Sequence, residues 1–247
     1  MRAIILAAGE GTRLRPHTDN SPKCLVEIGG RTILEHQLKN CLAAGIKEVV
    51  VVTGFKWEAV EERLNGWRSN GLGRLDIKTV FNPFWREANN LISLWSARHF
   101  MDDGFILING DDVFDHQILT RVRSENHYNI HVCIDRKDSY DEDDMKIQLD
   151  GDRIQRINKT IATDNAHGES IGIMKFTRAG AERLLHELED MVRGQNACTD
   201  WYTKAIERIA VDGYEIGTVN VEGLRWAEID FPEDLEYVRD ELSGLVQ

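Results

Sequence analysis

The chain has 247 residues and a formal net charge of −12 at pH 7. Its length allows a substantial core, and we expect a single domain over residues 1–247. Nucleic acids and anionic membrane surfaces bind clustered Lys and Arg, so the acidic balance argues against both as main partners. The four cysteines have no metal-ligand spacing, and we find neither an export signal nor a stretch long enough to span a membrane, which predicts a cytoplasmic protein.

Apolar runs alternate with helical patterns through the first half of the chain. Runs at 3–8, 48–53, 75–81 and 105–108 predict strands, and 24–28 is a shorter apolar piece. Helical spacing predicts helices from 33 to Gly45, near 57–64, at about 90–99 and at 115–125. This alternation implies a parallel sheet covered on both faces, where ligands gather at the carboxyl ends of the strands.

The pattern changes after residue 125. Short strands at 129–134, 145–149 and 153–158 predict a small β insertion, the last two forming a hairpin. The acidic run 138–144 is most simply a solvated loop. A strand at 171–176, helices near 178–192 and 200–211, a strand near 214–219 and a last helix from Pro232 complete the prediction.

Two glycines follow the first predicted strand. Gly9 and Gly11 have no side chain to keep an anion from the backbone, and consecutive N–H groups in such a turn can hold one. Arg13 and Lys23 add positive charge. These parts predict a phosphate site, although a Gly-x-Gly turn alone is weak evidence because it lacks the rest of the dinucleotide and P-loop motifs.

The full string from Leu6, Leu-Ala-Ala-Gly-Glu-Gly-Thr-Arg-Leu-Arg-Pro, with Pro22-Lys23 behind it, resembles the signature of nucleotidyltransferases that activate sugar phosphates and small alcohol phosphates. The resemblance implies a Rossmann-like three-layer α/β fold with a mostly parallel central sheet and a small β insertion. It also implies a nucleotide-binding part at about 1–125 and an acceptor-binding part at about 126–247. The residues of the string expected to bind the nucleotide are Leu6, Ala8, Gly9, Gly11 and Thr12.

Joining a phosphate to a nucleoside triphosphate brings like charges together. Each such repulsion at ~4 Å is worth about 4 kcal/mol at an effective dielectric constant near 20. We therefore expect Arg13 and Lys23 to be the catalytic cations that stabilise the transition state, together with Mg²⁺ on the phosphate oxygens.

Carboxylates are the protein ligands that Mg²⁺ prefers. Asp111, at the end of its predicted strand, and Asp230, in a Glu-Ile-Asp segment, are the expected ligands, and the family resembled here has metal aspartates at both points. Other interpretations stay open at this stage. Asp111 and Asp112 also fit a polar turn, with Asp112 either altering the metal number or facing solvent, and Asp230 also fits a helix cap.

The segment 82–94 narrows the resemblance. Its Asn-Asn-x-x-Ser-Leu sequence looks more like cytidylyltransferases acting on phosphocholine, inositol phosphate or 2-aminoethylphosphonate than like hexose-1-phosphate enzymes. We expect Asn89 or Ser93 to read the pyrimidine or its ribose. Asn90 is a good helix N-cap and is placed with them at the nucleotide.

Several residues of the second half are candidates for the acceptor. Lys146 and Lys159 are expected to meet its phosphate, and Glu169 a hydroxyl or a cationic amine, although each lysine also fits a solvated surface. Aromatic faces bind quaternary ammonium groups, so tryptophans and a nearby acid could enclose a choline-like head, although any single tryptophan at a helix start more often packs in the core. These last candidates are Trp201, Trp226 and Glu228.

The sequence thus predicts a Mg²⁺-dependent cytidylyltransferase that transfers CMP from CTP to a small phosphate or phosphonate acceptor and releases pyrophosphate. A homodimer is left open. The alternatives are a hexose-1-phosphate nucleotidyltransferase using UTP, dTTP or GTP, and a regulatory module that binds the nucleotide without turnover.

Overall fold

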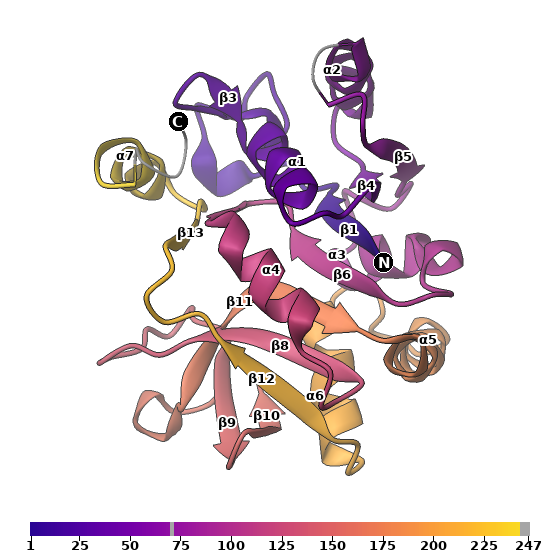
Figure 1. Ribbon diagram of the computed structural model, residues 1–247, viewed down its shortest axis with the longest axis vertical. Helices are drawn as coiled ribbons and strands as arrows, with labels where there is room; N and C mark the ends of the chain where they lie inside the picture. The colour runs from indigo at the N-terminus through magenta and orange to yellow at the C-terminus, as the bar shows by residue number, and fades with distance from the viewer. Residues whose placement is uncertain (70–71, 243–247) are drawn as a thin grey trace.

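The computed structural model describes residues 1–69 and 72–242. A nine-stranded sheet runs through the molecule in the order β5-β4-β1-β6-β11-β8-β12-β10-β9 (Figure 1). Its strands are β1 (Arg2–Ala7), β4 (Glu48–Thr53), β5 (Asp76–Phe81), β6 (Phe105–Asn109), β8 (Ile130–Asp135), β9 (Lys146–Asp150), β10 (Arg153–Ile157), β11 (Gly168–Phe176) and β12 (Ile216–Asn220).

Two small sheets accompany the large one. They pair β2 (Glu27–Ile28) with β3 (Arg31–Thr32), and β7 (Asp112–Phe114) with β13 (Trp226–Glu228). The α-helices in the described part of the chain are α1 (Ile33–Ala43), α2 (Trp57–Ser69), α3 (Asn90–Ser96), α4 (His116–Ser124), α5 (Arg178–Val192), α6 (Tyr202–Val211) and α7 (Pro232–Asp240). None of them is long and apolar enough to cross a membrane.

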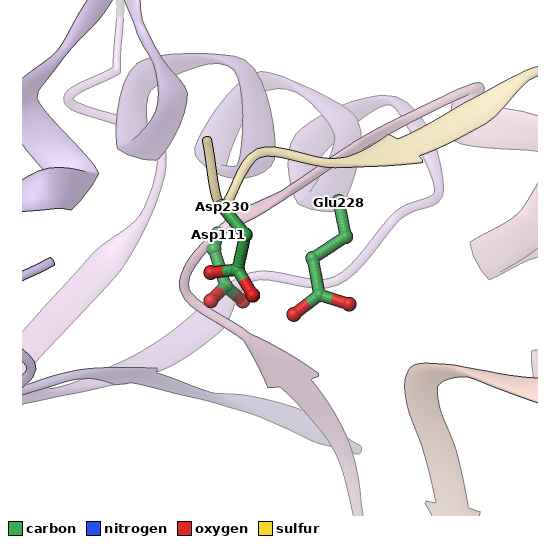
Figure 2. Close-up of side chains that lie close together, drawn as sticks. All are labelled: Asp111, Glu228 and Asp230. Atoms are coloured by element: carbon green, nitrogen blue, oxygen red, sulfur yellow. The ribbon is translucent and has the colours of Figure 1, made fainter. Parts of the chain in front are cut away.

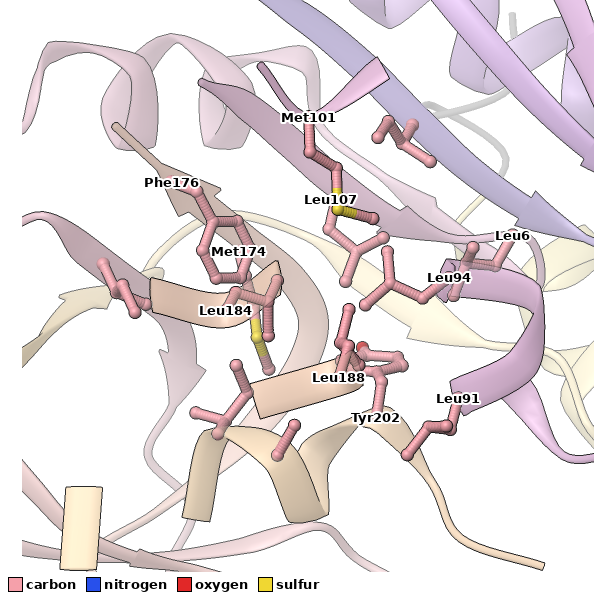
Figure 3. Close-up of a cluster of buried hydrophobic side chains, with 14 of the residues drawn as sticks. Leu6, Leu91, Leu94, Met101, Leu107, Met174, Phe176, Leu184, Leu188 and Tyr202 are labelled. Carbon is pink, nitrogen blue, oxygen red and sulfur yellow. The ribbon is translucent and has the colours of Figure 1, made fainter. Parts of the chain in front are cut away.

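The large-sheet strands of the first half are parallel. β1, β4 and β6 are buried on both faces, whereas the edge strand β5 is partly exposed. β4 pairs with β1 and β5, and β1 pairs with β6, all in parallel. Alternate residues of β1 belong to different cores: Ile4 and Leu6 pack with α3, α5 and α6, whereas Ile5 and Ala7 pack with α1, α2 and α4. Figure 3 shows part of the first core, to which Leu6, Leu107 and Tyr202 all belong. The predicted three-layer α/β fold is confirmed.

The second half of the sheet is mixed. β11 runs antiparallel to β6 and β8, β12 runs parallel to β8, and the hairpin β9–β10 pairs with β12 through β10. The predicted hairpin is therefore present. Its first strand also pairs with the start of β11, so that the strands from β8 to β12 form a closed circuit of pairings.

Several element boundaries differ from the prediction. α2 continues to Ser69 because Trp67 in its last turns packs into the second core. α3 ends at Ser96, and a separate 3₁₀ turn follows at Arg98–Phe100. β11 begins at Gly168, earlier than predicted, because that residue pairs with Ile147 of β9. β7 and β13 were not predicted, since each is only three residues long.

A third, smaller core ties the glycine turn to the C-terminal segment. It contains Leu14 of the 3₁₀ helix Thr12–Leu14, Ile229, and Leu235 and Val238 of α7, all with no exposed surface. Packing Leu14 in the same cluster as Ile229 brings their neighbours Arg13 and Asp230 together, although the chain between them is more than 200 residues long.

Candidate active site

A cleft of about 280 Å³ opens at the carboxyl ends of β1 and β6 and extends to the start of β11. Residues from both halves of the chain line it. The sequence-predicted site residues among them are Leu6, Ala8, Gly9, Arg13, Asn89, Asn90, Ser93, Asp111, Lys159, Glu169, Trp201 and Glu228. The predicted residues outside this lining are Gly11, Thr12, Lys23, Lys146, Trp226 and Asp230.

The glycine turn is shaped by Lys23. Gly11 has a φ of +72°, and a Cβ there would lie 2.8 Å from the Cβ of Lys23, so only glycine fits this contact. The hydroxyl of Thr18, a fully buried residue that was not among the predicted site residues, donates to the Gly11 carbonyl at 2.7 Å. Gly9 has open space where its Cβ would be, and it lines the cleft.

Lys23 joins the two predicted metal ligands. Its Nζ donates to Asp111 Oδ2 at 2.8 Å and also contacts Asp230, and its side chain is only 11% exposed. Burial alone would lower the pKa of Lys23, but the charges of Asp111 and Asp230 outweigh it and raise that pKa. Lys23 therefore stays charged and holds the two carboxylates side by side.

A third carboxylate completes this group. Oxygens of Asp111, Glu228 and Asp230 lie within 4.8 Å of one another (Figure 2). Glu228 stands at the end of β13, where it pairs in register with Asp112 of β7. Partial removal from water and the negative charges of Asp111 and Asp230 raise the pKa of Glu228. We call these three carboxylates, together with the Lys23 that pairs with two of them, the carboxylate cluster (Lys23, Asp111, Glu228 and Asp230). The oxygen atoms of its three acidic residues are hard donors that fit a divalent cation such as Mg²⁺.

The capping interpretation of Asp230 is wrong. Phe231 is the N-cap residue of α7, and Pro232 is in its first turn. The carboxylate that caps this helix is that of Asp234, which accepts from the backbone N–H groups of Asp230 at 2.8 Å and Phe231 at 2.7 Å. The side chain of Asp230 is consequently left to contact Lys23 and Arg13.

Asp112 does not face solvent and is not part of an open turn. It is 1% exposed and begins β7, and burial, followed by the charge of Asp111, raises its pKa well above the usual value. Gly172 of β11 has a φ of +75°, and a Cβ there would lie 2.5 Å from Asp112 Oδ2. Within the described residues Oδ2 has no hydrogen-bond partner.

The two asparagines at the start of α3 hold another segment. Asn89, not Asn90, is the N-cap residue, and neither amide caps the helix. The Nδ2 of Asn89 donates to the carbonyl of Thr199 at 2.9 Å, and the Oδ1 of Asn90 accepts from the backbone N–H of Tyr202 at 3.0 Å. Ser93, also in the cleft lining, accepts from the buried amide of Asn82 at 3.0 Å.

An acidic side chain from the run 138–144 enters the cleft. Asp143 contacts Arg13 at 3.3 Å and Lys159 at 2.5 Å, and Lys159 Nζ lies 5.0 Å from the ring centre of Trp201. The hydrogen bond from Lys159 is the main reason that the pKa of Asp143 is lowered. We call Asp143, Lys159 and Trp201 the loop cluster. Asp143 is exposed, as predicted for this acidic run, but it also pairs with two cations of the cleft, which the prediction did not include.

Lys146 does not reach the cleft. It is 1% exposed, and its Nζ donates to the carbonyls of Asp141, Glu142 and Asp144 at 2.8, 3.0 and 3.3 Å. These carbonyls flank Asp143. Lys146 thus shapes the loop that carries Asp143, and its ammonium has no free donor for an acceptor phosphate.

The predicted enclosure by two tryptophans does not form. Trp226 packs against the second core and donates its Nε1 to Asp135 at 2.8 Å, outside the cleft lining. Trp201 is 40% exposed in the cleft. Glu169, also in the lining, is buried beside Lys137, and its burial raises its pKa to about 7 against the opposing effect of that lysine.

Sequence comparison identifies the family. The characteristic pattern of the Nucleotidyl transferase family matches residues 2–235. The chain belongs to this family. It is a nucleotidyltransferase, as the glycine string predicted.

Relatives with named activities cover most of the chain. A CMP-5'-(3-aminopropyl)phosphonate synthase of Streptomyces rubellomurinus is 30% identical over 95% of this chain, which spans only 37% of that protein. The choline-phosphate cytidylyltransferase of Streptococcus pneumoniae is 23% identical over 99% of each chain. A UTP–glucose-1-phosphate uridylyltransferase, AglF, of Haloferax volcanii is 26% identical over 100% of this chain and 97% of its own.

The fold is shared with solved structures. The inositol-1-phosphate CTP transferase from T. maritima superposes with a TM-score of 0.83 at 21% identity, over 99% of this chain and 94% of that one. The phosphocholine cytidylyltransferase LicC from Streptococcus pneumoniae gives 0.76 at 22% identity over 98% of each chain.

Proposed function

We propose that this nucleotidyltransferase is a Mg²⁺-dependent cytidylyltransferase that acts on a small phosphate or phosphonate. One observation carries the proposal: Arg13 contacts both the carboxylate cluster, through Asp230, and the loop cluster, through Asp143. One cleft therefore offers cations and carboxylates for a triphosphate beside a second cation and an aromatic face for an acceptor. The relatives that use CTP or form a CMP-linked phosphonate support the choice of cytidine.

In the proposed reaction an anionic oxygen of the acceptor attacks the α-phosphorus of CTP. The new P–O bond forms as the bond from the α-phosphorus to the bridging oxygen of the β-phosphate breaks, and pyrophosphate leaves with the electron pair. An ionised acceptor oxygen needs no general base. The protein has mainly to align the two substrates and neutralise charge.

Arg13 and Lys23 supply fixed positive charge in this scheme. Arg13 is half-exposed at the cleft, where a phosphate oxygen can replace one of its carboxylate partners, and Lys23 is kept protonated by Asp111 and Asp230. The backbone around Leu6, Ala8 and Gly9 is proposed to accept the nucleotide, with Gly11 and Thr12 shaping the turn behind it.

Asp111 and Asp230 are proposed as the protein ligands of Mg²⁺, with Glu228 as a third. Their oxygens are close enough to share one ion. When bound, the ion would neutralise charge on the phosphate oxygens. Glu228 was predicted to contact the acceptor, and its place beside both aspartates favours the metal role.

Lys159, Glu169 and Trp201 are proposed to receive the acceptor. Lys159 can pair with its phosphate or phosphonate, while Glu169 and the exposed face of Trp201 suit a cationic group at its other end. The assignment to nucleotide and acceptor parts at 1–125 and 126–247, the cytoplasmic location and a homodimer stay predictions.

Pyrophosphate release tests the proposal. CTP, UTP, dTTP and GTP should each be offered with phosphocholine, an aminoalkylphosphonate, inositol 1-phosphate and glucose 1-phosphate, with Mg²⁺ present. We expect release with CTP and an amine-bearing acceptor. Preference for UTP, dTTP or GTP with glucose 1-phosphate would support the hexose-1-phosphate alternative, and binding of nucleotide without release in any combination would support a regulatory module.

A further inference from the structure

The segment 198–202 carries Trp201 into the cleft and is attached to the start of α3 by three hydrogen bonds. The backbone N–H of Asn89 donates to the carbonyl of Cys198 at 2.7 Å. The side chain of Asn89 donates to Thr199, and that of Asn90 accepts from Tyr202. We call Asn89 and Asn90 the asparagine clasp.

The far end of the segment is also fixed. The hydroxyl of Tyr202 donates to Asn109 Oδ1 at 2.9 Å, and Tyr202 is 1% exposed. Asn109 is the last residue of β6, two positions before Asp111. The exposed Trp201 thus stands between an anchored Thr199 and an anchored Tyr202, and its ring orientation relative to Lys159 depends on both anchors.

The bonds of the clasp use opposite halves of the two amides. Asn89 donates through its Nδ2 to the carbonyl of Thr199, and Asn90 accepts through its Oδ1 from the backbone N–H of Tyr202. This fixes how each amide is turned. Among the described residues, the Oδ1 of Asn89 and the Nδ2 of Asn90 are left for other partners, and both residues line the cleft.

We propose that Asn89 and Asn90 are positioning residues for the acceptor, holding the segment 198–202 so that Trp201 forms one wall of the acceptor site. The asparagines that were predicted to read the nucleotide therefore act on the other substrate as well. The kinetic part of this inference rests on the proposed function, whereas the ordering of the segment does not.

Replacement of asparagine by aspartate should have different effects at the adjacent positions 89 and 90. Asn90→Asp keeps an acceptor for the Tyr202 N–H and strengthens it by charge. Asn89→Asp replaces the donor to Thr199 with a carboxylate, which faces a carbonyl and cannot donate. Both variants add one negative charge at the same end of α3, so any effect of charge on the nucleotide is shared.

The first measurement is hydrogen–deuterium exchange over the peptide 198–202 in the full chain, without substrates. We expect exchange about tenfold faster in Asn89→Asp and in Asn90→Ala, because each variant loses one hydrogen bond to the segment, and no acceleration in Asn90→Asp. Ser96→Ala, which removes a bond from the Ser96 hydroxyl to Ile92 within the same helix, is the control and should leave the peptide unchanged.

The second measurement is steady-state kinetics with CTP and the acceptor found in the pyrophosphate screen. We expect the acceptor KM to rise about tenfold in Asn89→Asp relative to Asn90→Asp, with similar CTP KM in the two. Equal exchange rates and equal acceptor KM values in the two Asp variants would overturn the proposal. If exchange changes as expected but the wild type releases no pyrophosphate, the proposed function fails while the clasp stands.

Discussion

The carboxylate cluster and the loop cluster meet in one cleft but are built differently. In the first, Lys23 and Asp230, whose side chains are 11% and 14% exposed, come from segments adjoining the small third core, and Lys23 also pairs with Asp111, which is 25% exposed. Glu228 is the exposed member of this cluster. In the second, the side chain of Asp143 is 61% exposed and comes from a loop. Exposed ion pairs contribute little and rearrange easily, whereas buried ones are costly to break. The molecule therefore combines a fixed end for chemistry with an adaptable end for the acceptor.

The largest effects should come from the fixed end. Asp111→Asn and Asp230→Asn should each lower kcat by about 10²–10³-fold, because each removes charge from the proposed metal site. Circular dichroism should show an intact fold. A rate near that of the wild type in either variant would remove that aspartate from the metal site.

Replacing Lys23 tests whether the fixed end is held by its ion pairs. Lys23→Ala leaves Asp111 and Asp230 together without their shared cation and should lower the free energy of unfolding by about 3 kcal/mol, measured by urea denaturation. The control is Lys39→Ala, which breaks an exposed pair with Glu35 on α1 and should cost less than about 1 kcal/mol. Equal losses in the two variants would contradict the distinction between the clusters.

At the adaptable end, the same substitution at Trp201 and at Trp226 gives a test variant and its control. Trp201→Leu should raise the KM of an ammonium-bearing acceptor by about 3- to 30-fold, since the exposed ring can bind a cation. Trp226→Leu should leave this KM unchanged, because Trp226 packs outside the cleft. Similar KM changes in both variants would mean that the ring of Trp201 has no specific part in acceptor binding.

A smaller effect is expected at Asp143, whose carboxylate occupies Arg13 and Lys159. Asp143→Asn should free both cations for phosphate and lower the acceptor KM by about two- to fivefold, the range for an exposed ion pair. Glu142→Gln removes the same charge from the same loop and serves as the control. A higher KM in Asp143→Asn would indicate that Asp143 itself contacts the acceptor.

Glu169 should affect stability only through pH. Its pKa is raised from 4.5 to about 7 in the folded state, so between these values the folded chain binds a proton that the unfolded chain releases. The free energy of unfolding contributed by this group should therefore fall as pH rises through that window and level off above it. Urea denaturation should show the difference between wild type and Glu169→Gln changing in this way, and a constant difference would refute the raised pKa.

Local sequence was sufficient for the sheet and the glycine turn beside the fixed end. The run of valines in β4 predicted a strand buried on both faces, and the glycine string predicted the turn that carries Arg13 and leads to Lys23. Their chemistry depends on residue type at short spacing, which a sequence displays directly. The meeting of Asp111 with Asp230 came from the family resemblance, because the small core that joins these segments has no local pattern.

The adaptable end was predicted less well for a physical reason. The surroundings of Lys146 and Trp226 depend on segments that pack only in the folded chain. Lys146 could face solvent or bind loop carbonyls, and Trp226 could face the cleft or the core. The same holds for Asn90, whose partner Tyr202 is 112 residues away. Capping could account for only one of the two asparagines, so the Asn89-Asn90 pair was a usable signal of a role beyond starting a helix.

The most direct test of the central claim is pyrophosphate release from CTP measured with and without an amine-bearing phosphonate acceptor, in wild type and in Asp230→Asn side by side. We expect the wild type to release pyrophosphate only when acceptor and Mg²⁺ are both present, with Asp230→Asn slower by about 10²-fold or more. Pyrophosphate release that is independent of the acceptor, or equal in the two proteins, would contradict the account. In that account the carboxylate cluster activates the triphosphate, and an acceptor bound at the loop cluster attacks it.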